Sequence, residues 1–200
     1  MNVLFATTNP AKIRRFKSQL EKEGIHLLSI IDINTKLDIN ENGKDALENA
    51  LIKARAYYNS TKLITIGMDD NLFIEGIPEE KQPGTLVRRV NGKELNDDEM
   101  IEYYSNLARE YGGKLKAKWV YGVAVCNGKE EKTLTWSKSH FYLTDKPATK
   151  RNPGYPLDSI SISPRFGKYF VDLTEEEKLE LNKESSETEV IKFLIRNIKN

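Results

Sequence analysis

The sequence predicts an α/β fold with a long, mixed, twisted sheet flanked by helices, and three observations support this prediction. First, short apolar segments alternate with segments of helical periodicity over residues 2–69, which favours parallel strands joined by right-handed crossovers. Second, two long strand-like segments flank Asn127-Gly128, the strongest short-range signal for a β-hairpin. Third, 200 residues suffice for one sizeable core, so we expect residues 1–200 to form a single domain.

The elements of the first half follow from capping signals and periodicity. The first helix has Asn9 as a suitable N-cap and Pro10 at its first position. The second helix carries four apolar residues with the spacing of a buried stripe: Leu47, Ala50, Leu51 and Ala54. We therefore expect strands at 2–6, 26–32 and 62–69 and helices at 10–23 and 44–59.

The second half should contain a helix, a hairpin and a closing helix. The helix begins at Asn96, has acidic residues in its first turn and ends at Gly112-Gly113. The closing helix has the periodicity of a helix docked on the core. The expected ranges are 96–111 for the helix, 116–126 and 131–143 for the hairpin strands, and 187–198 for the closing helix.

The junction between the first strand and the first helix predicts a phosphate site. The backbone N–H groups of a first helical turn lie at the positive end of the helix dipole and favour anions. With the hydroxyls of Thr7 and Thr8, the cap Asn9 and the ammonium of Lys12, they would form a cradle for phosphate. An ordinary capped turn would show the same pattern.

A second set of polar residues lies along the second helix and after the third strand. Asn49 and Lys53 lie away from the buried stripe of the helix, on a face that can line a cleft. Asp69 and Asp70 are expected at the C-terminal end of a strand, where open α/β sheets bind ligands. Carboxylates there suit Mg²⁺, which takes one or two of them and adds water and phosphate oxygens. The alternatives are a solvated turn for the aspartates and an exposed helix face for Lys53.

Taken in order, these segments resemble the Ham1-like inosine triphosphate pyrophosphatase family. The family pattern A-T-x-N-x-x-K is matched from Ala6 to Lys12, and E-N-A-x-x-K-A is matched from Glu48 to Ala54. The pattern D-D-S-G-L appears at residues 69–72, one residue short. The other matching segments are Pro83-Gly84 with Arg89, Gly167-Lys168 and residues 173–178. The resemblance thus extends over nearly the whole chain.

The resemblance implies a fold, a reaction and an assembly. The family fold is a long mixed sheet in two lobes around a central nucleotide cleft. The implied reaction is Mg²⁺-dependent hydrolysis of a nucleoside triphosphate to a nucleoside monophosphate and pyrophosphate. Thr7, Thr8, Asn9, Lys12 and Lys53 would hold the phosphates, and Glu41, Asp69 and Asp70 would hold the metal. Asp70 would orient or deprotonate the attacking water, and the family implies a homodimer.

The chain departs from the family at one expected metal ligand. The glutamate of the family motif E-x-x-G corresponds to Asn40, and Glu41 follows one residue later. Either Glu41 has taken over this role, or the metal depends more on Asp69 and Asp70.

The segments that recognise the base in the family are rewritten here. The family motif G-F-G-Y-D-P corresponds to residues 152–157, which have the sequence N-P-G-Y-P-L in this chain. The aspartate of the motif is therefore lost unless Asp158 replaces it. The family motif S-H-R reads Asn182-Lys183-Glu184. By position, Tyr155 would stack on the base, Lys178 would support the base or sugar, and Lys183 and Glu184 would select the base.

Two substrate choices follow from this rewriting. An ionised glutamate only accepts hydrogen bonds, so it would favour a base edge that carries an amino group over a six-oxo purine. Alternatively, Lys183 or Arg151 supplies the missing donor, and the enzyme keeps a non-standard purine substrate such as ITP, XTP or dITP.

Composition excludes several other classes of function. With 31 basic and 30 acidic residues, the chain lacks the basic excess typical of nucleic-acid binding. A single cysteine, Cys126, and two separated histidines do not form a zinc cluster. The N-terminus has no signal-peptide pattern, and no apolar run reaches the roughly 20 residues that span a bilayer. We therefore expect a soluble cytoplasmic protein.

Two rival functions need comparison. Maf-like pyrophosphatases share the general fold and reaction, but they open with a serine-rich motif ending in arginine that this chain lacks. A nucleotide-binding or sensing protein that has lost catalysis would explain Asn40, although it would have less need of Lys53 and both aspartates.

Overall fold

The computed structural model describes residues 1–184 and 187–199, with the side chains of residues 182–184 outside its description. The described residues form two compact units, each made of several chain segments. The first unit contains Met1–Asp70, Val120–Trp136 and Ser186–Asn200, and the second contains Asn71–Trp119 and Ser137–Ser185. The expectation that residues 1–200 behave as one domain stays a prediction.

Strands of the first unit confirm the parallel arrangement predicted for the first half. β1 (Asn2–Phe5) pairs in parallel with β2 (His26–Ser29) and with β3 (Thr65–Ile74). The order along the sheet is β2-β1-β3-β6-β8-β9, with β7 paired to β6. The remaining strands of this sheet are β6 (Lys114–Cys126), β7 (Glu131–Ser137), β8 (Phe141–Thr144) and β9 (Ser161–Ile162).

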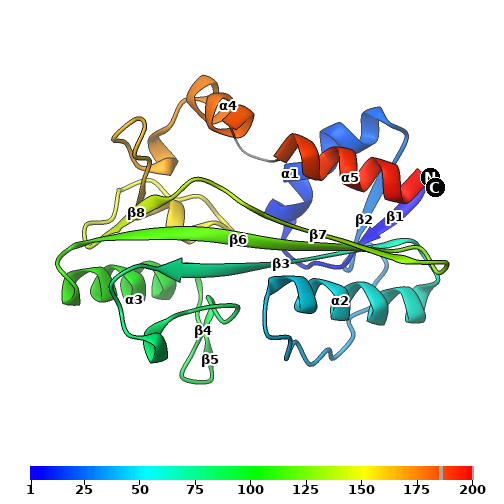
Figure 1. The fold of residues 1–200 in the computed structure, drawn as a ribbon, viewed down its shortest axis with the longest axis horizontal. Coiled ribbons are helices and arrows are strands. Elements are labelled where there is room, and N and C mark those ends of the chain that lie inside the picture. The colour runs from blue at the N-terminus through cyan, green and yellow to red at the C-terminus, as the bar shows by residue number, and fades with distance from the viewer. Residues whose placement is uncertain (185–186, 200) are drawn as a thin grey trace. The chain divides into compact units, whose positions relative to one another are not determined.

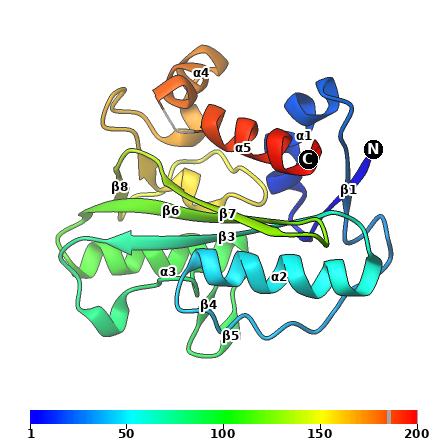
Figure 2. The same cartoon turned by 45° about the vertical axis from the view of Figure 1, so that its right-hand side comes forward.

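The helices of the first unit lie on both faces of its strands (Figures 1 and 2). α2 (Ala46–Thr61) covers one face, and α1 (Pro10–Lys22) lies with α5 (Glu187–Lys199) on the other. As predicted, α1 begins after the N-cap Asn9, whose Oδ1 accepts a hydrogen bond from the N–H of Ala11 at 2.9 Å. Its apolar face buries Phe16 and Leu20.

Two glycines let α2 approach the sheet closely. A Cβ atom on Gly67 of β3 would lie 2.0 Å from the carbonyl oxygen of Ala50, and one on Gly122 of β6 would lie 2.4 Å from the backbone nitrogen of Leu47. Such separations leave no room for any side chain. The helix therefore rests directly on the strand that carries Asp69 and Asp70.

The second unit is built around α3 (Asp97–Glu110), which packs against β8. The helix begins with a capping box, in which the side chains of Asn96 and Glu99 each accept a hydrogen bond from the other residue's backbone N–H. Tyr104 is fully buried in its core and donates a hydrogen bond to the carbonyl of Val87 at 2.8 Å. The other elements are β4 (Arg89–Val90), β5 (Lys93–Glu94) and α4 (Glu175–Glu184).

Several predicted elements differ from the structure, and β2, expected at 26–32, ends at Ser29. The strand expected at 131–143 is interrupted, because β7 ends at Ser137 and β8 begins at Phe141. α4 was not predicted, since its sequence is polar and lacks a periodic apolar stripe. Most important for function, β3 continues to Ile74, so Asp69 and Asp70 lie inside the strand rather than after its end. Two consecutive aspartates normally favour a turn.

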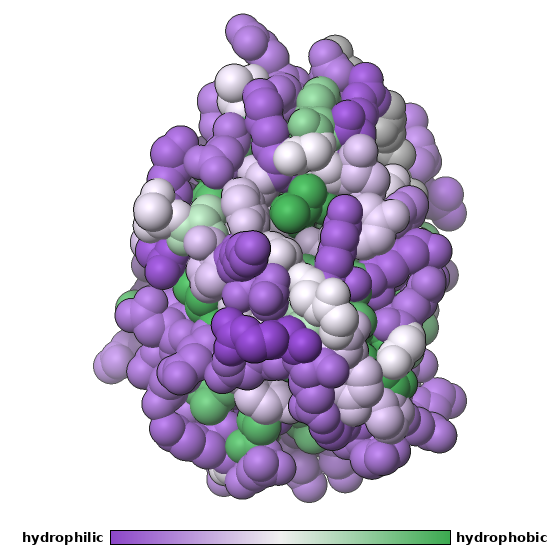
Figure 3. Space-filling view, turned by 90° about the vertical axis from the view of Figure 1, so that its left-hand side faces the viewer, coloured by the Kyte–Doolittle hydropathy of each residue, from purple (hydrophilic) through white to green (hydrophobic). Residues whose placement is uncertain are grey.

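The surface of the molecule agrees with its composition. Charged residues make up 30% of the chain, and the face drawn in Figure 3 is mainly hydrophilic with small, separate hydrophobic patches. Among the described residues, no helix combines the length and apolar character needed to cross a membrane.

Candidate active site

The loop after β1 has most of its polar groups already engaged. Besides the Asn9 cap, the N–H of Asn9 donates to Oγ1 of Thr7 at 3.1 Å, and the N–H of Lys12 reaches the carbonyl of Asn9 at 3.2 Å. The expectation that first-turn N–H groups would be left for an anion is therefore wrong for Ala11, whose N–H serves the cap. A phosphate would depend more on side chains, namely the exposed Thr8, the hydroxyl of Thr7 and the ammonium of Lys12.

Lys12 forms an ion pair with Asp70. Its Nζ lies 2.9 Å from Oδ2 of Asp70, and the two side chains are only 16% and 23% exposed. Burial lowers the pKa of Lys12, but the charges of Asp70 and Asp69 outweigh it and raise the pKa above its ordinary value. Lys12 is therefore a permanent cation at neutral pH. The other oxygen of Asp70, Oδ1, is buried and has no hydrogen-bond partner among the described residues.

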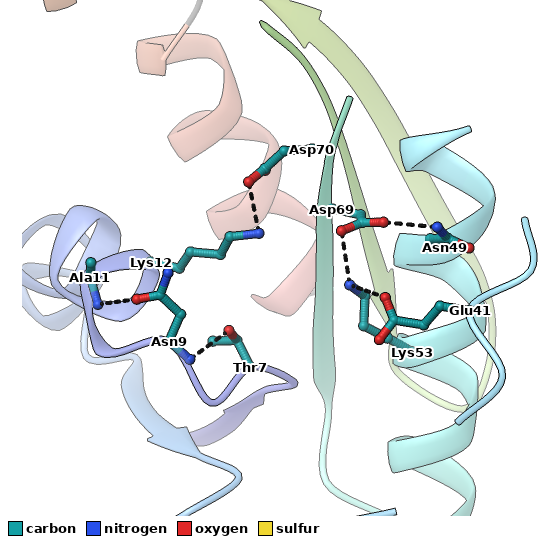
Figure 4. Close-up of polar contacts among 9 residues, drawn as sticks. All are labelled: Thr7, Asn9, Ala11, Lys12, Glu41, Asn49, Lys53, Asp69 and Asp70. Carbon is teal, nitrogen blue, oxygen red and sulfur yellow. Dashed lines mark hydrogen bonds and ion pairs between the residues drawn. The ribbon is translucent and has the colours of Figure 1, made fainter. Parts of the chain in front are cut away.

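Asp69 faces a different group of residues (Figure 4). Its Oδ1 lies 3.2 Å from Nζ of Lys53, and its Oδ2 accepts a hydrogen bond from Nδ2 of Asn49 at 2.9 Å. Lys53 also donates to Oε2 of Glu41 at 3.0 Å. Both Asn49 and Lys53 belong to α2, four residues apart, so they lie on the same face of that helix.

The two aspartates separate because they are neighbours within a strand. Successive side chains of a β-strand point to opposite faces, so Asp69 points towards α2 and Asp70 towards α1. The expectation of a carboxylate pair at a strand end is thus replaced by two separate lysine–carboxylate pairs. No group of three or more histidine, cysteine, aspartate or glutamate side chains in the described part of the chain could hold a metal ion, so Glu41, Asp69 and Asp70 do not converge.

The residues around Lys53 nevertheless suit a hard cation. Oxygens from Glu41 and Asp69 both contact the ammonium of Lys53, which is only 11% exposed, so a metal ion held by both carboxylates would take the place of this ammonium. Mg²⁺ is commonly held by one or two carboxylates, with water and substrate phosphate oxygens completing its shell. That Glu41 takes the role of the family glutamate stays a prediction, and Asp70 lies on the opposite face of β3.

The expected base-binding residues belong to the second unit. Oδ2 of Asp158 accepts a hydrogen bond from Nδ2 of Asn152 at 2.7 Å. Burial raises the pKa of Asp158, although Asn152, Lys138 and Lys178 act in the opposite direction.

For the other residues predicted to contact the base, the structure gives their burial and their partners within the protein. Tyr155 is partly buried, and Lys178 pairs with Glu175 at 2.7 Å. Arg151 donates hydrogen bonds to backbone carbonyls, including that of Ala148. The side chains of Lys183 and Glu184 lie outside the described residues.

Two residues of this site were not assigned a role from the sequence. These residues are Asn49 and Gly43. Asn49 is 2% exposed and contacts both Asp69 and Gly43, which belongs to the loop that carries Glu41. The signals were the position of Asn49 beside the apolar stripe of α2 and the place of both residues in the family motifs E-N-A-x-x-K-A and E-x-x-G. A polar residue next to a buried stripe is usually solvated, so the first of these signals was weak.

Comparison with known proteins identifies the relationship. The sequence profile of the Ham1 family matches residues 3–186. The chain belongs to the Ham1 family. A dITP/XTP pyrophosphatase from Thermoanaerobacter sp. (strain X514) is 32% identical over 182 residues, covering 89% of this chain and 88% of the relative. One from Bacillus licheniformis is 32% identical over 197 residues, covering 96% and 95%.

Structural comparison confirms the predicted fold class of this Ham1 family member. The structure of a HAM1 protein from Coxiella burnetii superposes with a TM-score of 0.76 at 22% identity, covering 100% of this chain and 98% of that one. The mixed α/β fold with a sheet flanked by helices is therefore shown. The placement of two lobes around a nucleotide cleft stays a prediction.

Proposed function

We propose that this Ham1 family protein hydrolyses a nucleoside triphosphate to a nucleoside monophosphate and pyrophosphate. The observation that carries the proposal is the pair of partly buried lysines on opposite faces of β3, Lys12 against Asp70 and Lys53 against Asp69 and Glu41. Fixed positive charge beside carboxylates suits phosphoryl transfer, in which positioning and charge stabilisation supply most of the catalysis. The activity in the names of the two relatives supports the same reaction.

The phosphate chain is proposed to bind at the start of α1. Thr7, Thr8 and Asn9 would offer polar hydrogens, and Lys12 would offer its ammonium. Because Lys12 contacts Asp70 in the absence of a ligand, an arriving phosphate would share this ammonium with the carboxylate. Lys53 would provide a second positive charge as negative charge develops on the leaving pyrophosphate.

Glu41 and Asp69 would hold a Mg²⁺ ion, which when bound adds positive charge at the phosphate oxygens and polarises them for attack. Asp70 is proposed to orient or deprotonate the attacking water. Its Oδ1 has no hydrogen-bond partner among the described residues and is therefore available to accept one from water. The two adjacent aspartates would then have different tasks, one on each face of the strand.

Tyr155 is proposed to stack on the base, and Lys178, Lys183 and Glu184 are proposed to line it. The relatives' names give dITP and XTP as their substrates, while the rewritten base segments of this chain favour a shift in preference. We further propose that the protein acts as a homodimer on free nucleotides in the cytoplasm.

The direct test is release of pyrophosphate from a panel of nucleoside triphosphates, with Mg²⁺ and with a chelator. We expect pyrophosphate and the matching monophosphate in equal amounts, and loss of both when the metal is removed. Release of inorganic phosphate instead would contradict the proposed site of cleavage. Nucleotide binding without turnover would favour the sensing function, for which Asn40 at the expected glutamate position is the supporting observation.

A further inference from the structure

Asn49 connects the two carboxylates that face Lys53. Its amide oxygen accepts a hydrogen bond from the N–H of Gly43 at 2.8 Å, and its amide nitrogen donates to Oδ2 of Asp69 at 2.9 Å. Gly43 lies two residues after Glu41, in the loop before α2. The buried amide thus contacts the segment that carries one carboxylate and the side chain of the other.

The orientation of the Asn49 amide is determined by its two partners. A backbone N–H only donates, and an ionised carboxylate only accepts, so the oxygen must face Gly43 and the nitrogen must face Asp69. An aliphatic residue of similar size could make neither hydrogen bond. The contact therefore requires an amide at this position.

The loop side of this connection has no spare room. A Cβ atom on Gly43 would lie 2.7 Å from Oδ1 of Asn49 and 2.7 Å from Cβ of Glu48. The next residue of the loop is also attached, because the N–H of Lys44 donates to Oε2 of Glu48 at 2.9 Å. The loop that carries Glu41 is therefore held directly against the first turns of α2.

The strand side orients the carboxylate of Asp69. With Oδ2 engaged by Asn49, Oδ1 remains directed at Lys53, 3.2 Å away, where Glu41 also contacts the same ammonium. We propose that Asn49 is a positioning residue that holds Glu41 and Asp69 at the separation needed to bind a divalent cation. The inference rests on the proposed function, and it adds a residue that would touch neither substrate nor metal.

A test must separate positioning from ordinary packing. Asn49→Leu keeps a similar volume but removes both hydrogen bonds. The matched control is Asn197→Leu on α5, since Asn197 is also buried, at 7% exposure, and among the described residues its amide nitrogen donates to a backbone carbonyl, that of Phe193. Both substitutions should lower the melting temperature. Only Asn49→Leu should change cation binding.

The measurement is binding of Mn²⁺ alone to the full chain, without nucleotide, by isothermal titration calorimetry. Mn²⁺ prefers the same carboxylate oxygens as Mg²⁺. Loss of a residue that orients metal ligands commonly weakens metal binding by roughly 10–100-fold, and we expect this range for Asn49→Leu. Asn197→Leu should bind Mn²⁺ with the wild-type affinity.

A second variant covers the case in which Asn49→Leu does not fold. Gly43→Ala keeps the Asn49 amide but would place a Cβ atom 2.7 Å from its Oδ1, which should push the Glu41 loop away and also weaken Mn²⁺ binding several-fold. Wild-type affinity in Gly43→Ala and in any folded Asn49→Leu would overturn the proposal, as would absence of Mn²⁺ binding in the wild type. Failure of the proposed reaction would instead appear in the pyrophosphate assay, whatever these affinities are.

Discussion

At the scale of single residues, the site is organised by two lysines that each neutralise a different carboxylate group. Lys12 reaches Asp70 from α1, and Lys53 reaches Asp69 and Glu41 from α2. Removing one member of such a partly buried pair leaves an uncompensated charge. Each substitution therefore changes the remaining partner as well, and kinetic effects must be read together with stability.

The first prediction concerns Asp70, the proposed general base. Asp70→Asn should lower kcat by roughly 10²–10⁴-fold, because a group that acts on the attacking water contributes to the transition state. Binding of a triphosphate should be kept, because Lys12, freed from the charge of Asp70, can still contact the phosphates. Steady-state kinetics and equilibrium binding would measure the two effects. Asp38→Asn, on an exposed position of the same unit, is the control, and full activity of Asp70→Asn would remove the proposed mechanism.

The second prediction concerns the phosphate chain. Lys12→Ala should raise KM for triphosphates by about 10–100-fold, the range expected for loss of a charged hydrogen bond of about 1.5–3 kcal/mol. A monophosphate should bind with nearly unchanged affinity, because Lys12 is placed against the leaving phosphates. Lys22→Ala, exposed on the last turn of the same helix, is the matched control. Equal effects on both nucleotides would place Lys12 elsewhere.

At the scale of elements, the contact of α2 with β3 determines which residues meet. Gly67 brings the helix backbone close to the strand, and this contact places Asn49 and Lys53 over Asp69. The mean position of a helix on a sheet is usually set by side chains that interdigitate. Here the position of α2 on β3 depends on Gly67, which has no side chain.

The third prediction tests this contact. Gly67→Ala should lower the free energy of unfolding by about 1–3 kcal/mol, the usual cost of overpacking, because its Cβ would lie 2.0 Å from the carbonyl oxygen of Ala50. It should also lower activity, since Lys53 and Asn49 move with the helix. Urea unfolding and the pyrophosphate assay measure the two effects. Gly24→Ala, where φ is +74° and the space is open, should lose stability through backbone strain yet keep full activity.

At the scale of the whole molecule, the family relationship and the rewritten base segments lead to two predictions. The fourth is a homodimer, the commonest symmetric assembly of soluble proteins and the one that the family resemblance implies. Light scattering coupled to size exclusion should give twice the chain mass of 22.9 kDa at micromolar concentration. A single chain mass under those conditions would refute it.

The fifth prediction is that substrate preference has moved away from inosine and xanthine triphosphates. A six-oxo base facing an ionised Glu184 would place two acceptors together, which costs on the order of 1–3 kcal/mol, about tenfold or more in specificity. The alternative donor Arg151 is engaged with backbone carbonyls. Comparing kcat/KM for competing nucleotides in wild type and Glu184→Arg measures the shift. A wild-type preference for inosine triphosphate by orders of magnitude would show that the family specificity survives.

The sequence by itself determined the fold class, the order of the main elements, the Asn127-Gly128 hairpin and the family. These features depend on local signals, such as the Asn9 cap before Pro10, that act over a few residues and so can be read in order along the chain. Only the tertiary structure decided that β3 continues through Asp69 and Asp70 and that the strand's alternation sends them to opposite faces. It also decided how Asn49 meets Asp69, because that contact depends on packing between segments distant in sequence.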